Sequence, residues 1–232
     1  MPVYKKVNKV FFKKWSDEMA YVLGFFAADG YITVNKRGGQ FWCIQITDKK
    51  LLESIRKVID SNHKISSRVR INTKEKTQYR LQIGSIEMCD DLRKLGFSER
   101  KTKNLSIPNI PRKYFPDFVR GYFDGDGNVW SGYVHKERNK KTLVLFTAFT
   151  SCSLQFLTTL HHKLKLFGIK GGSIYKPKNK DFSRLQLSIL DSLKLSEIMY
   201  NGKAYYTNGL FLKRKKKVFD VYRSYFAAVA QR

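Results

Sequence analysis

Two aspartates, each at the end of an apolar stretch, are the residues of this chain whose types and spacing could do chemistry. The stretches are Tyr21–Gly30, which reads YVLGFFAADG, and Phe118–Gly127, which reads FVRGYFDGDG. Asp29 and Asp126 each precede a glycine that can adopt the left-handed conformation that stops a helix. The dipole of a helix disfavours a carboxylate at its C-terminus, and a divalent cation would relieve the repulsion between two of them. The pair therefore predicts a metal site, whereas a single Asp-Gly would be read as a solvated helix end.

Small residues four apart should bring these two stretches together. They are Gly24 and Ala28 in the first copy, and Gly121 and Gly125 in the second. Residues four apart lie on one face of a helix, and a face of small residues lets two helix backbones approach closely. We expect the two helices to pack face to face, with their C-terminal ends side by side.

The same order of elements follows each stretch, which predicts an α+β fold of two tandem αββαββα repeats. Alternating and helical hydrophobic patterns define the elements. In the first repeat we expect a helix ending near residue 29, strands at 31–37 and 41–47, a helix at 48–60, strands at 67–72 and 78–83, and a helix at 86–95. In the second we expect a helix ending at 127, strands at 128–135 and 142–150, a helix at 153–167, strands at 172–175 and 183–189, and helices at 190–200 and 218–230.

Matching tetrapeptides support a duplication. Arg80–Ile83 corresponds to Arg184–Leu187, and Ile46-Thr47 is matched with Phe149-Thr150. The offset grows from 97 between the two aspartates to 103 between the two threonines, which would make the first turn 6 residues longer in the second repeat (103 − 97). Prolines at 108, 111 and 116 mark a linker, so we expect repeats at residues 1–105 and 117–232 with a linker at 106–116.

Composition points to a nucleic-acid partner. The 232 residues carry 45 Lys+Arg against 19 Asp+Glu, a formal net charge of +26 that is spread along the chain. A structural RNA binder would share this charge. Cys43, Cys89 and Cys152 lack the spacing of a disulfide framework or a zinc site, which favours reduced thiols. The basic N-terminus has no apolar signal segment, and no run is long enough to span a membrane, so we expect an intracellular protein without a membrane partner.

Val22–Gly30 and Val119–Gly127 resemble the two motifs of LAGLIDADG homing endonucleases of the single-chain, two-motif type. The resemblance covers nearly the whole chain and implies a pseudo-two-fold monomer with saddle-shaped antiparallel sheets. It also implies that Asp29 and Asp126, with the preceding Ala28 and Gly125, bind two or three Mg²⁺ ions, for which Mn²⁺ or Ca²⁺ can substitute in binding. The first motif departs from the pattern at residue 27, an alanine where the second has Asp124, but in the family this position lies off the metal site.

The resemblance further implies polar side chains that order water around the metals. Asp48 matches one such position and Ser151 is taken as its counterpart in the second repeat. Lys101 resembles the lysine that reaches the site from the first repeat. In the second repeat the choice among Lys213, Arg214 and Lys215 stays open, and simple phosphate contact is the alternative for all of these residues.

The solvated faces of the sheets are expected to read DNA. Their side chains are Arg, Gln and Asn with almost no acid, and Arg–guanine and Gln/Asn–adenine are the usual major-groove pairs. The predicted DNA-binding residues are Thr33, Asn35, Arg37, Gln45, Arg68, Arg70, Asn72, Gln78, Arg80 and Gln82 in the first repeat, and Trp130, Lys176, Arg184, Gln186, Ser188, Lys213 and Lys215 in the second.

By resemblance, the chain is predicted to be a monomeric homing endonuclease that makes metal-dependent double-strand breaks with short 3′ overhangs in a long DNA target. It would act in the cytoplasm of a prokaryote or in a mitochondrion or plastid. Two alternatives remain on the same fold: an RNA maturase whose partner is intron RNA, and a DNA-binding regulator that does not cleave.

Overall fold

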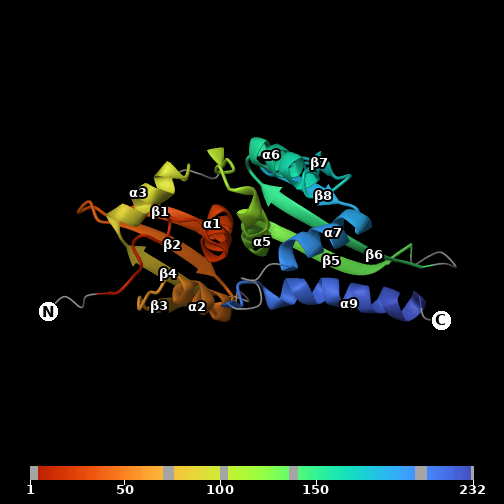
Figure 1. Ribbon diagram of the computed structural model, residues 1–232, viewed down its shortest axis with the longest axis horizontal. Coiled ribbons are helices and arrows are strands. Elements are labelled where there is room, and N and C mark those ends of the chain that lie inside the picture. The colour runs from red at the N-terminus through yellow and green to blue at the C-terminus, as the bar shows by residue number, and fades with distance from the viewer. Residues whose placement is uncertain (1–4, 70–75, 100–103, 136–140, 202–207, 231–232) are drawn as a thin grey trace. The chain divides into compact units, whose positions relative to one another are not determined.

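The computed structural model describes residues 5–69, 76–99, 104–135, 141–201 and 208–230 (Figure 1). Residues 227–230 are described by their backbone alone. The contacts divide the chain into two compact units. Unit 1 comprises residues 1–125 and 202–211, and unit 2 comprises residues 126–201 and 212–232. Within the described ranges, no helix is both long and apolar enough to cross a membrane.

Helix α1 (Asp17–Asp29) forms the centre of unit 1. It begins at Ser16, whose hydroxyl accepts a hydrogen bond from the backbone N–H of Met19 at 3.1 Å. Every residue from Met19 to Ala27 is buried, because the helix is apolar on all sides. The sequence therefore predicts this helix by its cap and its continuous apolar run, without an amphipathic pattern.

A four-stranded antiparallel sheet follows, made of β1 (Gly30–Val34), β2 (Gln40–Ile46), β3 (Ile65–Arg68) and β4 (Gln78–Gly84) in the order β1-β2-β4-β3. Trp42 pairs with Ile83 and Ile44 with Leu81, and all four side chains are fully buried. Helices α1, α2 (Lys49–Val58) and α3 (Ile86–Lys94) pack against the sheet. This burial of alternate residues leaves the opposite face of the sheet for polar side chains.

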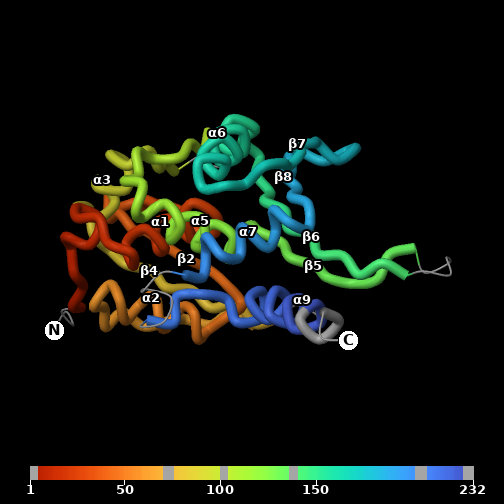
Figure 2. Tube along the Cα trace, turned by 45° about the vertical axis from the view of Figure 1, so that its right-hand side comes forward, coloured from red at the N-terminus to blue at the C-terminus, as the bar shows by residue number. Residues whose placement is uncertain are grey.

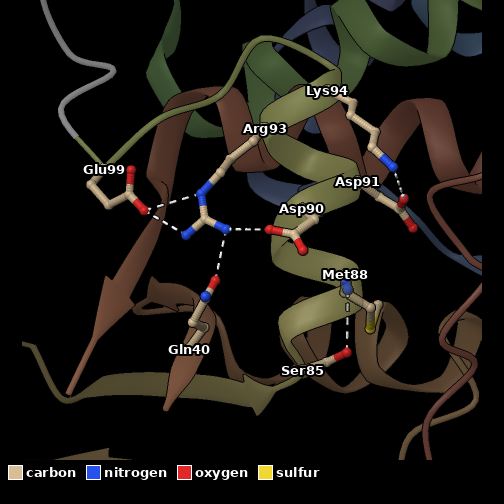
Figure 3. Close-up of polar contacts among 8 residues, drawn as sticks. All are labelled: Gln40, Ser85, Met88, Asp90, Asp91, Arg93, Lys94 and Glu99. Carbon is tan, nitrogen blue, oxygen red and sulfur yellow. Dashed lines mark hydrogen bonds and ion pairs between the residues drawn. The ribbon is translucent and has the colours of Figure 1, made fainter. Parts of the chain in front are cut away.

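Polar contacts hold α3 in place (Figure 3). Ser85 caps the helix by accepting a hydrogen bond from the N–H of Met88 at 3.2 Å. Arg93, in the last turn, donates to Gln40 of β2 at 2.7 Å and to Glu99 at 2.6 Å. These contacts join the end of α3 to the start of β2 and to the following loop.

The second motif forms α5 (Phe115–Asp126), preceded by a turn of 3₁₀ helix at Arg112–Tyr114. The expected linker therefore ends in regular structure, since Pro116 is the second residue of α5. A proline is tolerated in the first helical turn, where its missing N–H would have no intrahelical partner.

Unit 2 has a matching four-stranded antiparallel sheet of β5 (Gly127–Val134), β6 (Thr142–Ser151), β7 (Ser173–Tyr175) and β8 (Ser183–Leu187), in the order β5-β6-β8-β7. Helices α6 (Leu154–Lys165) and α7 (Ile189–Tyr200) pack on this sheet. Helix α9 (Lys213–Ala230) runs along β5 and contacts α7 (Figures 1 and 2). The two repeats confirm the predicted α+β fold.

The strand register corrects the sequence alignment of the two repeats by two residues. Ile44 pairs with Leu81 in unit 1, and Phe149 pairs with Leu185 in unit 2. Ile44 is thus the counterpart of Phe149, and the hairpin of the first two strands is 8 residues longer in the second repeat, since Gly30 to Ile44 is 14 residues and Gly127 to Phe149 is 22. Longer strands account for most of the difference, because the turn itself is only 2 residues longer, at 135–141 against 35–39. The error kept every side chain on its correct face, because a slip of two residues preserves the alternation of a strand.

Helix α9 begins five residues earlier than predicted, at Lys213 instead of Val218. The sequence prediction places the basic run at 213–217 before the helix, and basic residues in a first turn do oppose the helix dipole. Lys215, Phe219 and Tyr222 are buried at helical spacing, so packing of this face stabilises the first turn.

Candidate functional site

The two motif helices cross at their glycines, as predicted. A Cβ atom added to Gly24 would lie 2.1 Å from the backbone oxygen of Phe118, and one added to Gly121 would lie 2.1 Å from the backbone oxygen of Tyr21. Real Cβ atoms do not approach a carbonyl oxygen so closely. The close approach of α1 and α5 therefore requires glycine at both positions.

Both motif aspartates are the last residues of their helices. Asp29 is half-buried at the end of α1, and Asp126 is exposed at the end of α5. A Cβ atom on Gly125 would lie 3.2 Å from Oδ2 of Asp29 and 2.3 Å from the Cβ of Ala28. The close packing against Ala28 therefore requires glycine at position 125, and it brings the backbone before Asp126 next to the carboxylate of Asp29, which lies at the negative end of its helix.

One detail of the motif prediction is wrong. Gly30 ends α1 in an extended conformation, with φ −90° and ψ 160°, and not in the left-handed region. A Cβ atom on Gly30 would lie 2.1 Å from the ring of Phe26. Glycine is required here because of this contact, and the chain enters β1 without a turn.

The other predicted site residues have varied positions. Asp48 caps α2, where Oδ1 accepts a hydrogen bond from the N–H of Leu51 at 2.9 Å. In unit 2 the equivalent cap is Ser153, which accepts from Phe156 N at 3.2 Å, so Ser153 and not Ser151 is the counterpart of Asp48. Ser151 is buried at the end of β6, and its hydroxyl accepts from the N–H of Ser153 at 3.1 Å. Lys101 lies outside the described residues.

The structure distinguishes the three basic candidates of α9. Lys213 and Arg214 are exposed, whereas Lys215 is 6% exposed. The Nζ of Lys215 donates a hydrogen bond to the carbonyl oxygen of Gly127 at 2.5 Å, and Gly127 directly follows Asp126. Lys215 therefore points to the start of β5, inside unit 2, rather than outward to solvent.

In the described ranges, His, Cys, Asp and Glu do not form any group of three or more that could hold a metal ion. The two motif aspartates alone supply only two carboxylates, one fewer than the smallest such group. Such a site would take its remaining ligands from backbone oxygens, water or phosphate, as is common for Mg²⁺.

Six of the predicted DNA-binding residues of the first repeat share the outer face of its sheet. Gln45 pairs with Arg80, and Arg68 pairs with Gln78, so these side chains lie opposite the buried face. The set is Thr33, Gln45, Arg68, Gln78, Arg80 and Gln82. These six residues come from all four strands, and Phe41 and Cys43 of β2 share their face.

Asn35 and Arg37 lie in the turn between β1 and β2 instead of on the sheet. The Oδ1 atom of Asn35 accepts hydrogen bonds from the N–H groups of Arg37 at 2.9 Å and Gly39 at 2.8 Å. Asn35 thus shapes the hairpin in the manner typical of turn asparagines. Arg70 and Asn72 lie outside the described residues.

Sequence reasoning did not include Tyr31 and Cys43, which also lie on this face. Tyr31 and Cys43 pair directly across β1 and β2, and the hydroxyl of Tyr31 interacts with the Cys43 thiol and the Arg80 guanidinium. Burial raises the pKa of the Tyr31 hydroxyl and of the Cys43 thiol, so both groups stay neutral. The alternation of β1 could have revealed Tyr31, which helps to position Arg80.

The outer face of the sheet in unit 2 is more aromatic. Trp130 and Phe146 are cross-strand partners whose rings stack with centroids 6.3 Å apart, and Trp130 remains 46% exposed. Arg184 and Gln186 lie on the same face, as predicted, and the hydroxyl of Tyr175 donates to Gln186 at 3.1 Å. Phe146 and Tyr175 were not predicted.

Two other residues predicted for this face lie outside its strands. Lys176 follows the end of β7 and is exposed. Ser188 follows β8 and caps α7, where its hydroxyl accepts from the N–H of Asp191 at 3.4 Å and donates to Oδ2 of the same residue at 3.1 Å. Ser188 therefore has a structural role that its place in an alternating pattern concealed.

Comparison with known proteins identifies both repeats. The family model described as a LAGLIDADG-like domain matches residues 16–96 and again residues 117–197. An uncharacterized protein of Methanocaldococcus jannaschii is 27% identical over 187 residues, which cover 77% of this chain and 64% of that protein. The chain thus spans a little under two thirds of the length of this relative.

Solved structures share the fold. The LAGLIDADG homing endonuclease I-SmaMI bound to cleaved DNA is 14% identical with a TM-score of 0.57, covering 89% of this chain and 87% of its own. The LAGLIDADG meganuclease I-AabMI bound to uncleaved DNA is 14% identical with a TM-score of 0.57, covering 94% and 92%. At these identities the comparison establishes the arrangement of elements and nothing finer.

Proposed function

Because the chain belongs to the LAGLIDADG-like family, we propose that it is a sequence-specific homing endonuclease that makes metal-dependent double-strand breaks, with short 3′ overhangs, in a long DNA target. The observation that carries this proposal is the glycine crossing of α1 and α5. It places Gly125, the residue before Asp126, next to the carboxylate of Asp29. The two motif aspartates, which we assign to the nuclease site, thus end helices that pack together.

We propose that Asp29 and Asp126 hold two or three Mg²⁺ ions, with the backbone at Ala28 and Gly125 contributing. The close approach of the Gly125 backbone to the carboxylate of Asp29 supports this assignment. Bound Mg²⁺ supplies charge neutralisation to the attacking and leaving oxygens of a phosphodiester. Both carboxyl groups lie at the negative ends of their helix dipoles, which add to the attraction for a cation.

Basic and polar residues would complete the site. Lys215 is the candidate of the second repeat, since its ammonium group is directed to the residue that follows Asp126. Lys101 is proposed for the equivalent task in the first repeat, and Asp48 for ordering water. An ammonium group in such a position would stabilise negative charge on the phosphate as the bond breaks.

The partner is proposed to be double-stranded DNA read by the two outer sheet faces, within the cell that houses the target. Arg68, Arg80 and the glutamines of the first sheet offer bidentate contacts to guanine and adenine. DNA-bound I-SmaMI and I-AabMI share this fold, which supports the assignment. The excess of basic side chains would supply the sequence-independent part of the affinity.

The test is cleavage of a library of duplex targets by the full-length protein with Mg²⁺. We expect cuts that stop on chelation with EDTA and resume when Mg²⁺ is restored, whereas Ca²⁺ would support binding. Asp29→Asn and Asp126→Asn should each lower the cleavage rate at least about 100-fold, because each removes a metal ligand worth several kcal/mol. Asp60→Asn is the matched control: its carboxylate pairs with Lys6 on the surface, and asparagine tolerates its left-handed φ of 47°.

The same assay separates the alternatives. Duplex binding that weakens with salt, without cuts under any divalent ion, would replace the nuclease with a DNA-binding regulator. Preference for a structured intron RNA over duplex DNA would point to a maturase. Cleavage that survives both aspartate substitutions would overturn the assigned site.

A further inference from the structure

The crossing of α1 and α5 is symmetric in its backbone contacts. Adding 97 to a residue number of α1 gives its counterpart in α5, so Gly24 becomes Gly121 (24 + 97). A Cβ atom added to Gly24 would lie 2.1 Å from the backbone oxygen of Phe118. The equivalent distance, from a Cβ atom added to Gly121 to the backbone oxygen of Tyr21, is also 2.1 Å. Each side chain of one helix therefore has a counterpart in an equivalent place on the other.

The side chains do not follow this symmetry. The hydroxyl of Tyr21 donates a hydrogen bond to Oδ2 of Asp124 at 2.7 Å, and both residues are at most 1% exposed. Their counterparts are Phe118 and Ala27, which are also buried. A phenol and a carboxylate thus occupy one side of the crossing, and a phenyl ring and a methyl group occupy the other.

Further charges extend the difference. The guanidinium of Arg120 lies 5.2 Å from the ring centroid of Tyr21, and its Nη2 atom lies 2.7 Å from a carboxylate oxygen of Asp117. The counterparts of Asp117 and Arg120 in α1 are Ala20 and Leu23. Helix α5 therefore buries three charged side chains at positions where α1 is apolar.

We infer that the Tyr21–Asp124 pair makes this interface selective, so that α1 accepts α5 and each helix rejects a second copy of itself. Two copies of α5 crossing in the same way would place Asp124 against Phe118 on both sides, with the phenol absent. Burying a carboxylate without that hydrogen bond is costly. Two copies of α1 would instead leave the Tyr21 hydroxyl opposite Ala27.

The partner that fits α1 is therefore the second repeat of the same chain. This inference goes beyond the proposed function and does not depend on it. Polar groups that fix the register and partner of helices are the best attested use of buried charge. A chain built in this way keeps two unequal motif helices in one interface.

The first test is a double-mutant cycle in the full-length protein, measured by urea unfolding. Tyr21→Phe and Asp124→Ala should each lower the folding equilibrium constant about 10- to 100-fold, as expected for a buried hydrogen bond to a charged group. The folding equilibrium constant of the double variant should be at least about fivefold higher than the value obtained by multiplying the two single effects. Single effects that simply multiply would overturn the inference.

The second test moves a carboxylate to the apolar side. Ala27→Asp should lower the folding equilibrium constant at least about tenfold more than Ala27→Asn, which has the same size without the charge. Adding Phe118→Tyr should narrow this gap, because it restores a phenol opposite the carboxylate. An unchanged gap would overturn the inference, and if these variants do not fold, the cycle at Tyr21 and Asp124 decides alone.

Discussion

Asp117 holds a carboxyl group inside unit 1, only 4% exposed and 2.7 Å from the guanidinium of Arg120. Burial raises the pKa of Asp117 to about 6 from 3.8, although the positive charge of Arg120 opposes the shift. A carboxyl group whose pKa is higher in the folded protein binds its proton more tightly there. Its contribution to stability is therefore complete below about pH 3.8 and is lost as the pH rises through about 6.

Substitution of Asp117 isolates this effect. The free energy of unfolding of the wild type minus that of Asp117→Asn should fall by roughly 2–3 kcal/mol between pH 4 and pH 7, since asparagine does not titrate. Urea unfolding at several pH values measures it. Glu99→Gln is a control with the opposite expected sign, because hydrogen bonds from Arg93 lower the pKa of Glu99. The free energy of unfolding of the wild type minus that of Glu99→Gln should therefore not fall as the pH rises. A difference for Asp117→Asn that rises with pH would mean that the carboxylate is charged throughout.

At the scale of elements, packing requires more from the motif helices than the sequence pattern shows. A Cβ atom on Gly121 or Gly24 would meet a backbone oxygen at 2.1 Å, and a backbone cannot move aside as a side chain can. Alanine is normally the better helix former by about 1 kcal/mol. If replacing glycine by alanine improves helix propensity and still destabilises the protein, the close crossing of α1 and α5 is the cause of the loss in stability.

We expect Gly121→Ala to lower the free energy of unfolding by about 2 kcal/mol or more, because the helices must separate to admit the methyl group. Gly121→Leu, where it folds, should cleave the proposed DNA target at least about 100-fold more slowly, since the aspartates move apart. Gly39→Ala is the control, because the three atoms nearest to its Cβ would belong to the side chain of Asn35 and not to a backbone. Cleavage at the wild-type rate by folded Gly121→Leu protein would contradict the geometric account.

The elements also mark what sequence can predict. The helix crossing, the two sheets and the outer polar face followed from small residues, alternation and turns, which are local signals. The counterpart of Asp48 did not, because Ser151 and Ser153 both suit a strand end and only the ladder register separates them. Likewise Lys215 looked like its neighbours in a basic run until helical packing buried it. Tertiary contacts decide such cases.

At the scale of the whole molecule, the dominant property is the net charge of +26. A charge of this size attracts any polyanion, so it governs affinity more than the choice of sequence. Lys213 and Lys217 are exposed in the first turns of α9, whereas Lys94 of α3 and Lys165 of α6 lie on helices that pack on the buried faces of the sheets. The pair Lys213 and Lys217 and the pair Lys94 and Lys165 carry the same charge and differ only in their position on the protein.

The salt dependence of DNA binding should therefore distinguish these pairs. Lys213→Gln with Lys217→Gln should reduce the slope of log affinity against log salt concentration by up to about 2, as each lost phosphate contact removes about 0.9. The control, Lys94→Gln with Lys165→Gln, removes the same charge and should leave the slope nearly unchanged. Fluorescence anisotropy with a labelled duplex, at salt concentrations from about 50 to about 300 mM, would measure the slope for each double variant. Equal slopes for the two double variants would mean that charge acts through the net value alone, and that α9 has no special place at the DNA.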